Sequence, residues 1–147
     1  MQSTFEYMIS HAKFLSKHLN PRHIDHCITA VLLELGIATS RAGFQQLKQG
    51  ILIHYKNPRR QATKDLYPAI GAMCRPAASG TQVEQTIRTA IQEAWIQRDE
   101  GVWMRFFPLN DDGLIEKPTS LDFISRVSRF LEVWQGCYKE GGYETME

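Results

Sequence analysis

Apolar residues recur at helical spacing in nearly every segment of this 147-residue chain. In the clearest stretch, Val83, Ile87 and Ala94 follow one another at i, i+4 and i+11, the spacing of a single helix face. No segment shows a convincing strand pattern, in which apolar and polar residues alternate. The pattern therefore predicts an all-α fold. The expected helices span residues 3–19, 21–35, 42–55, 62–74, 81–98, 101–107 and 120–135.

Residues that favour helix ends separate these segments. Asn20 and Pro21 fit an N-cap and a first helical position, and Gly36 fits the end of the helix that they open. Pro68 falls inside the fourth segment, where it should kink the helix or restart it. The expected divisions of the chain are an amphipathic N-terminal helix (1–20), a main domain (21–136) and a flexible tail (137–147).

Composition and cysteine usage are typical of a globular cytoplasmic protein. The chain is 43% hydrophobic and 22% charged, and no apolar run approaches the roughly 20 residues that cross a bilayer. Its three cysteines, Cys27, Cys74 and Cys137, are odd in number and far apart. This pattern favours reduced thiols over a secreted disulfide framework. We therefore expect a cytoplasmic protein that does not enter a membrane.

Positive charge is concentrated in one part of a nearly neutral chain. The formal net charge is only +1. The stretch from Arg41 to Lys64, however, holds six lysines and arginines and no acidic residue, whereas acidic residues gather near Asp111. Such a stretch can be a surface for nucleic-acid phosphates or simply a solvated face.

The residues that could carry catalysis or bind a metal form no recognised site. His23, His26 and Cys27 have i, i+3, i+4 spacing, which could bring three ligands to one metal ion. Cys27 nevertheless falls on the apolar stripe of its helix, where a thiol packs as a small hydrophobe. The motifs of serine hydrolases, zinc proteases and phosphate loops do not occur in the sequence. We expect neither an enzyme nor a cofactor or metal requirement.

The helix expected at 81–98 has a specific outward face. Thr81, Gln85, Arg88 and Gln92 form one polar stripe, with Glu84 beside it. Gln, Arg and Glu side chains are those that pair with base edges in the major groove of DNA. The preceding helix and turn would complete a helix-turn-helix. Two simpler interpretations remain open: Thr81 and Glu84 match a capping box, and a polar stripe of this kind is also typical of an ordinary solvated face.

Several short stretches occur in the same order and with similar spacing in a known protein family. From about Ile24 to Trp134 the chain resembles the C-terminal DNA-binding (effector) domain of the stage-zero sporulation protein A family, response regulators of endospore-forming bacteria. The stretches that carry the resemblance are Ile28-Thr29, Glu34-Leu35-Gly36-Ile37, Gly43-Phe44, Leu66-Tyr67-Pro68-Ala69-Ile70, Val83-Glu84, Ile87-Arg88, Ala90-Ile91, Ala94-Trp95, Lys117-Pro118-Thr119 and Phe123-Ile124.

The resemblance implies a compact bundle of about six helices containing a helix-turn-helix, here with the extra N-terminal helix. In the family, a Glu and the following Arg read bases, and an Arg one turn later holds a phosphate. Glu84 and Arg88 match two of these positions, whereas Gln85 replaces the middle Arg. Gln82 and Thr89 replace a further Arg and a His of the family pattern. These differences are compatible with the family's mode of DNA binding and point to an altered target sequence.

Two functions follow as hypotheses. In the first, the chain is a transcription regulator that binds double-stranded DNA through helix 81–98, as a homodimer that can contact an RNA polymerase sigma factor. In the second, it is a protein-interaction module that binds a sigma factor or a related regulator without specific DNA binding. In the first hypothesis Glu84 and Gln85 read bases. The residues then expected along the DNA backbone are Ser79, Thr81, Gln82, Arg88, Thr89, Gln92, Lys56, Arg59, Arg60 and Lys64.

The family's receiver domain has no counterpart in this sequence. About twenty residues precede the matching stretches, too few for a doubly wound domain of typical size. We therefore expect either an excised fragment or a receiver-less paralogue. Residues 3–19 should either dock on the domain or pair between two protomers.

Overall fold

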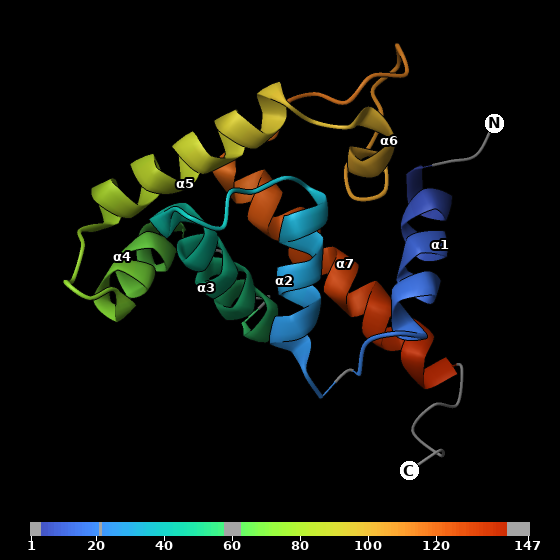
Figure 1. Ribbon diagram of the computed structural model, residues 1–147, viewed down its shortest axis with the longest axis horizontal. Coiled ribbons are helices and arrows are strands. Elements are labelled where there is room, and N and C mark those ends of the chain that lie inside the picture. The colour runs from blue at the N-terminus through green and yellow to red at the C-terminus, as the bar shows by residue number, and fades with distance from the viewer. Residues whose placement is uncertain (1–3, 21, 58–62, 141–147) are drawn as a thin grey trace.

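The all-α prediction is confirmed by a computed structural model, which describes residues 4–20, 22–57 and 63–140 (Figure 1). Within these ranges the only β pairing is an isolated bridge between Leu109 and Ile115. None of the described helices is both long and apolar enough to span a bilayer. The helices are α1 (Thr4–Ser16), α2 (Ile24–Glu34), α3 (Ala42–Lys56), α4 (Thr63–Met73), α5 (Gly80–Ile96), α6 (Glu100–Trp103) and α7 (Ser120–Glu140).

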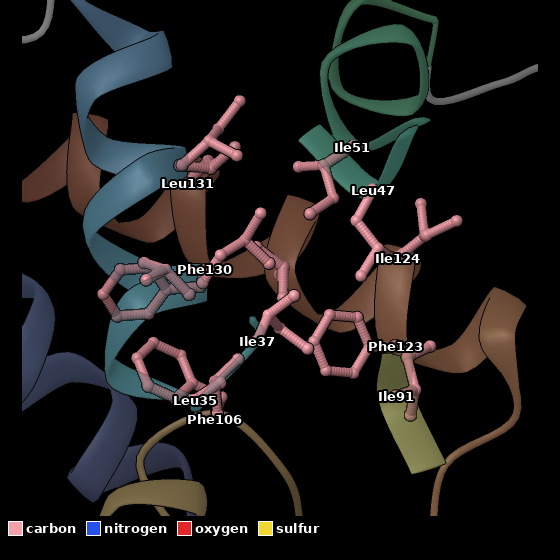
Figure 2. Close-up of a cluster of buried hydrophobic side chains, with 14 of the residues drawn as sticks. Leu35, Ile37, Leu47, Ile51, Ile91, Phe106, Phe123, Ile124, Phe130 and Leu131 are labelled. Carbon is pink, nitrogen blue, oxygen red and sulfur yellow. The ribbon is translucent and has the colours of Figure 1, made fainter. Parts of the chain in front are cut away.

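Helix α7 forms the centre of the bundle, and α1, α2, α3 and α5 all pack against it. Its inward side chains Phe123, Phe130, Leu131 and Trp134 are fully buried. Figure 2 shows Phe123, Phe130 and Leu131 among apolar side chains from α3, from α5 and from the segment after α2. The helix runs through Gly136 to Glu140, beyond the end expected at residue 135. Each fully buried aromatic or aliphatic side chain stabilises the fold by roughly 1.5–3 kcal/mol relative to an exposed one.

Helix α2 ends as predicted but begins later. The Gly36 N–H donates to the Leu33 carbonyl and the Ile37 N–H to the Leu32 carbonyl, and Gly36 has a φ of 83°. This is a Schellman end, which requires the left-handed backbone that glycine adopts easily. Asn20, in contrast, is not the N-cap, because the helix begins at Ile24 with His23 as its N-cap. The Asn20 side-chain oxygen instead accepts from the Arg22 N–H before the helix starts.

Helix α1 docks on the bundle along α7 (Figure 1). Its apolar side chains Met8, Ala12 and Leu15, which have the spacing of one helix face, are buried. A polar contact adds to this packing, because His11 Nε2 lies 2.7 Å from Glu34 Oε2 on α2. The His11 ring also packs edge-on against Phe106. Of the two arrangements expected for residues 3–19, the described part of this segment adopts the docked one.

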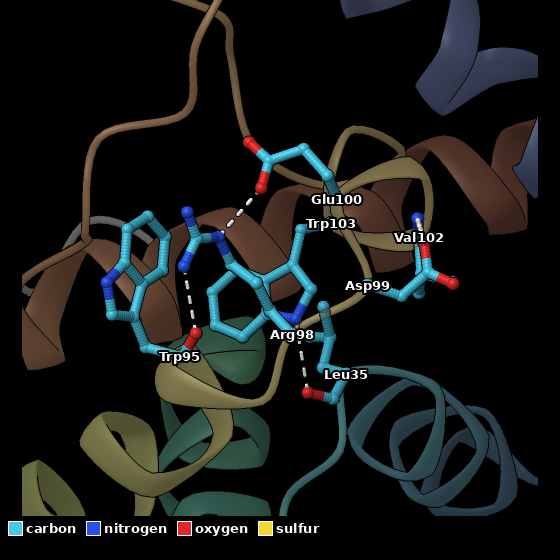
Figure 3. Close-up of polar contacts among 7 residues, drawn as sticks. All are labelled: Leu35, Trp95, Arg98, Asp99, Glu100, Val102 and Trp103. Atoms are coloured by element: carbon cyan, nitrogen blue, oxygen red, sulfur yellow. Dashed lines mark hydrogen bonds and ion pairs between the residues drawn. The ribbon is translucent and has the colours of Figure 1, made fainter.

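The connection between α5 and α6 explains why α5 is shorter than expected. The helix ends at Ile96, and the Arg98 side chain turns back to donate to the Trp95 carbonyl and to cover the Trp95 ring (Figure 3). Asp99 then caps α6 through the Val102 N–H. From α6, the Trp103 indole donates to the Leu35 carbonyl at 3.2 Å, which joins this region to the end of α2. The shorter α6 places the Phe106 and Phe107 rings after the helix, where both are buried.

Two glycines allow close contacts at the turn between α4 and α5. A Cβ atom on Gly71 would lie 2.0 Å from the Ala78 carbonyl oxygen, and one on Gly80 would lie 3.1 Å from the Pro68 ring. The Ala78 N–H also donates to the Gly71 carbonyl at 3.0 Å. A single helix, α4, runs through Pro68 from Thr63 to Met73, so the helix does not restart at the proline. These contacts fix the turn between the two helices.

Replacing Gly71 with alanine should therefore destabilise the protein. The new methyl group must displace the Ala78 backbone, and overpacking of this kind costs about 1–3 kcal/mol. Gly136→Ala is the matched control, because a Cβ at Gly136 meets no atom within 4 Å. That change should stabilise α7 by about 0.5–1 kcal/mol, since glycine is unfavourable inside a helix. Urea unfolding measures the free energy of unfolding of both variants. A Gly71→Ala protein as stable as the parent would contradict the close packing.

Candidate nucleic-acid interface

Helix α5 has one buried face and one polar face. Its buried residues are Val83, Ile87, Ala90, Ile91 and Ala94. At about 100° per residue, Gln85 lies almost opposite this apolar stripe, and Glu84 lies on its flank. The structure agrees, because Gln85 is exposed and Glu84 is half-buried. Of the other residues predicted on this face, Thr81, Gln82, Arg88 and Thr89 are exposed, and Gln92 is half-buried.

The first turn of α5 corrects the expected capping box. The N-cap is Ser79, whose hydroxyl accepts from the Gln82 N–H at 3.1 Å, while Gln82 Oε1 accepts from the Ser79 N–H at 2.9 Å. The Thr81–Glu84 capping box is therefore wrong, and Glu84 does not cap its own helix. Two overlapping sequences matched the motif, and the helix begins at the first of them. Ser79 and Gln82 are therefore hydrogen-bonded to each other, whereas the Glu84 carboxylate takes no part in capping the helix.

Glu84 instead pairs with Arg88 one turn later. Arg88 Nη2 lies 2.6 Å from Glu84 Oε1, and the two side chains are 59% and 43% exposed. An exposed i, i+4 ion pair contributes only about 0.3–0.5 kcal/mol. Arg88 can therefore exchange Glu84 for a phosphate oxygen at small cost. The same exchange would release the Glu84 carboxylate to accept a hydrogen bond from a base.

Glu84 and Arg88 line one side of an open cleft of about 670 Å³. Its other walls come from α4 and from the segment that leads into α7, and they include Tyr67, Lys117, Thr119 and Ser120. Burial and the nearby Glu84 charge raise the pKa of the Tyr67 hydroxyl, although a hydrogen bond with Ser120 and the Arg88 charge act in the opposite direction. The cleft thus brings two cationic side chains, an anion and several hydroxyl groups to the flank of α5.

Lys117 and Tyr67 are charged or titratable residues of this cleft to which the helical pattern assigned no role. They come from segments distant from α5 in sequence, so periodicity within α5 carries no information about them. The stretches Lys117-Pro118-Thr119 and Leu66-Tyr67-Pro68 do, however, belong to the family resemblance described above. That resemblance was the signal that could have found them.

The basic stretch from Arg41 to Lys64 does not form one uniform surface. Arg41 Nη1 lies 3.0 Å from Glu93 Oε1 and so pairs with α5. Helices α3 and α5 meet closely here, as shown by Gly43, where an added Cβ would lie 2.7 Å from the Ala90 Cβ. Lys56 is exposed at the end of α3, and Lys64 lies in the first turn of α4. Arg59 and Arg60 fall outside the described residues.

Cys27 cannot join His23 and His26 as a metal ligand in this fold. Its side chain is fully buried in the core, as the apolar stripe predicted. Burial, together with the Glu34 charge, raises the pKa of the Cys27 thiol to about 12. Only the thiolate binds metal strongly, so this cysteine packs as an apolar residue.

Comparison with protein-family models identifies the chain. Residues 28–131 match the family described as "Sporulation initiation factor Spo0A C terminal". The match covers more than two thirds of the sequence. It includes every helix from α3 to α6, most of α2 and the part of α7 that carries Phe123 to Leu131. Helix α1 lies outside it. The helical bundle, its α4–turn–α5 unit and this match together show that the chain belongs to the Spo0A C-terminal domain family.

Proposed function

We propose that this protein is a cytoplasmic transcription regulator that binds double-stranded DNA by placing α5 in the major groove. The observation that carries the proposal is the geometry of α5. One face of the helix is locked against α3, α4 and α7, and the opposite face presents Thr81, Gln85, Arg88 and Thr89 to solvent. A second helix of a helix-turn-helix reads DNA with such a face. Membership in a sporulation initiation factor family supports this reading.

Within this proposal, base reading falls to Glu84 and Gln85. A glutamine amide pairs with the N6 and N7 edge of adenine, and a carboxylate accepts from the amino group of cytosine. Arg88 would leave Glu84 to hold a phosphate, which sets the register of the helix without reading sequence. The proposed backbone contacts are Ser79, Thr81, Gln82, Thr89, Gln92, Lys56, Arg59, Arg60 and Lys64.

A protein-interaction role is the second candidate, and the Glu84–Arg88 ion pair favours it. The one arginine on the outward face of α5 is already neutralised by a carboxylate, and its neighbours are glutamines and threonines. In this alternative, the surface binds a sigma factor or a related regulator without specific DNA binding. The two candidates differ in salt dependence, because phosphate contacts release counterions.

Labelled genomic DNA fragments, bound at two salt concentrations, should show affinity that falls steeply with salt. Replacing Arg88 with alanine should weaken binding to all fragments alike and reduce the slope of log affinity against log salt by about 0.9. Arg129→Ala is the matched control, since Arg129 is 61% exposed and also lies near a glutamate on its own helix. Equal salt slopes for the parent and both variants would show that Arg88 does not contact a DNA phosphate. Absence of DNA binding by the parent would favour the interaction module.

Replacing Gln85 with arginine should move base preference toward guanine at one position of the site. Arginine forms a paired contact with guanine O6 and N7, and one such contact discriminates by about 1–3 kcal/mol. Selection from randomised duplexes measures the preferred sequence of each protein. Gln97→Arg adds the same charge beyond the end of α5 and should leave the preferred sequence unchanged. An identical motif for the parent and Gln85→Arg would show that Gln85 does not read bases.

A further inference from the structure

Three potential metal ligands lie together at the start of α2, away from the proposed DNA-reading helix. They are His23, Asp25 and His26, and their ligand atoms all lie within 4.8 Å of one another. His23 is the N-cap residue of the helix, so Asp25 and His26 occupy its second and third positions. The two imidazole rings are stacked with centroids 4.8 Å apart, and Asp25 Oδ2 lies 4.0 Å from His26 Nε2.

The exposure of these side chains permits the small movements that a metal ion would require. All three residues are exposed, and the side chains of His26 and Asp25 are 63% and 52% exposed. Ligands on a tetrahedral zinc ion, at 2.0–2.2 Å from the metal, lie about 3.3 Å from one another. Rotations about the side-chain torsions can close the remaining gap, because no core packing holds these side chains in place.

The donor set selects the class of metal. Two imidazole nitrogens and one carboxylate oxygen suit Zn²⁺ and neighbouring first-row transition metals, whereas Mg²⁺ and Ca²⁺ prefer oxygen ligands alone. Asp25 also supplies a negative charge at the positive end of the helix dipole, where a bare cation would be disfavoured.

We propose that His23, Asp25 and His26 form a site for a divalent transition metal ion, with Zn²⁺ as the expected occupant and water in the fourth position. This site replaces the His23, His26 and Cys27 set considered from the sequence, because the helix turns Cys27 into the core while Asp25 faces solvent. Within the described part of the chain, His23 makes no side-chain capping hydrogen bond to the first turn of α2. A bound ion would join His23 to His26 and so supply the missing link between the N-cap and the first turn.

The direct test is a titration of the metal-free full chain with Zn²⁺ alone, in competition with a chelating dye. The site predicts saturable binding of one ion per chain, at Zn²⁺ concentrations well below millimolar. Binding also stabilises a folded state that alone contains the site, so the melting temperature should rise by a few degrees at saturation. Mg²⁺ and Ca²⁺ should produce neither effect.

Variants separate this site from other zinc-binding groups. His23→Ala and His26→Ala should each weaken binding at least tenfold, and Asp25→Asn should weaken it to a smaller extent. His18→Ala is the matched control, because His18 is exposed between α1 and α2 but is not one of the three ligands. Circular dichroism of each variant, which should retain the parent spectrum, establishes that the fold is intact.

Three results would overturn the proposal. The first is failure of the parent to saturate below millimolar Zn²⁺. The second is unchanged affinity in both histidine variants. The third is an intense thiolate-to-metal absorption band when Co²⁺ replaces Zn²⁺, which would assign the ion to Cys74 or Cys137 instead.

Discussion

Burial of the apolar face of α7 is the interaction on which the rest of the structure depends. Four helices pack against α7, and its aromatic residues Phe123, Phe130 and Trp134 are inaccessible to solvent. Because these side chains occupy the centre of the bundle, each surrounding helix must turn its own apolar stripe toward them. The polar faces that remain outside are a consequence of this packing. The outward face of α5 is one of them.

The α4–turn–α5 unit adds a second constraint, which is steric. Gly71 lets α4 contact the Ala78 backbone in the turn, and Gly80 lets the start of α5 contact the Pro68 ring of α4. Gly43 lets α3 approach α5. Larger side chains at these positions would push the packed segments apart. The orientation of α5 is therefore fixed by its contacts with α4 on one side and with α3 on the other. The backbone that carries Gln85 and Arg88 is therefore ordered before any partner binds, and only their side chains have conformational entropy to lose. Helix α1, outside the family match, adds contacts to α7 and α2 on another part of the bundle.

Periodicity predicted the helices and the exposed face of α5, because both depend on local spacing. It placed Val83, Ile87 and Ala94 in the core and Gln85 in solvent, as observed. The helix start could not be predicted in the same way, since Ser79 and Thr81 each begin a capping-box sequence. The Ala78–Gly71 hydrogen bond, which comes from another helix, fixes the turn that leads into Ser79. Lys117 and Tyr67 reach the cleft from distant segments, and Arg41 is paired with Glu93, so no local pattern could reveal either arrangement.

The central claim is that α5 is the surface that meets DNA. It is tested most directly by titrating the ¹⁵N-labelled protein with a short DNA duplex at low salt and mapping the amide chemical-shift changes onto the sequence. Non-specific electrostatic binding suffices for this measurement, so the target sequence need not be known. If α5 meets the DNA, the largest changes fall on the turn before α5 and on Thr81, Gln85, Arg88 and Thr89. Changes confined to α1 and α2, or none at all, would contradict it.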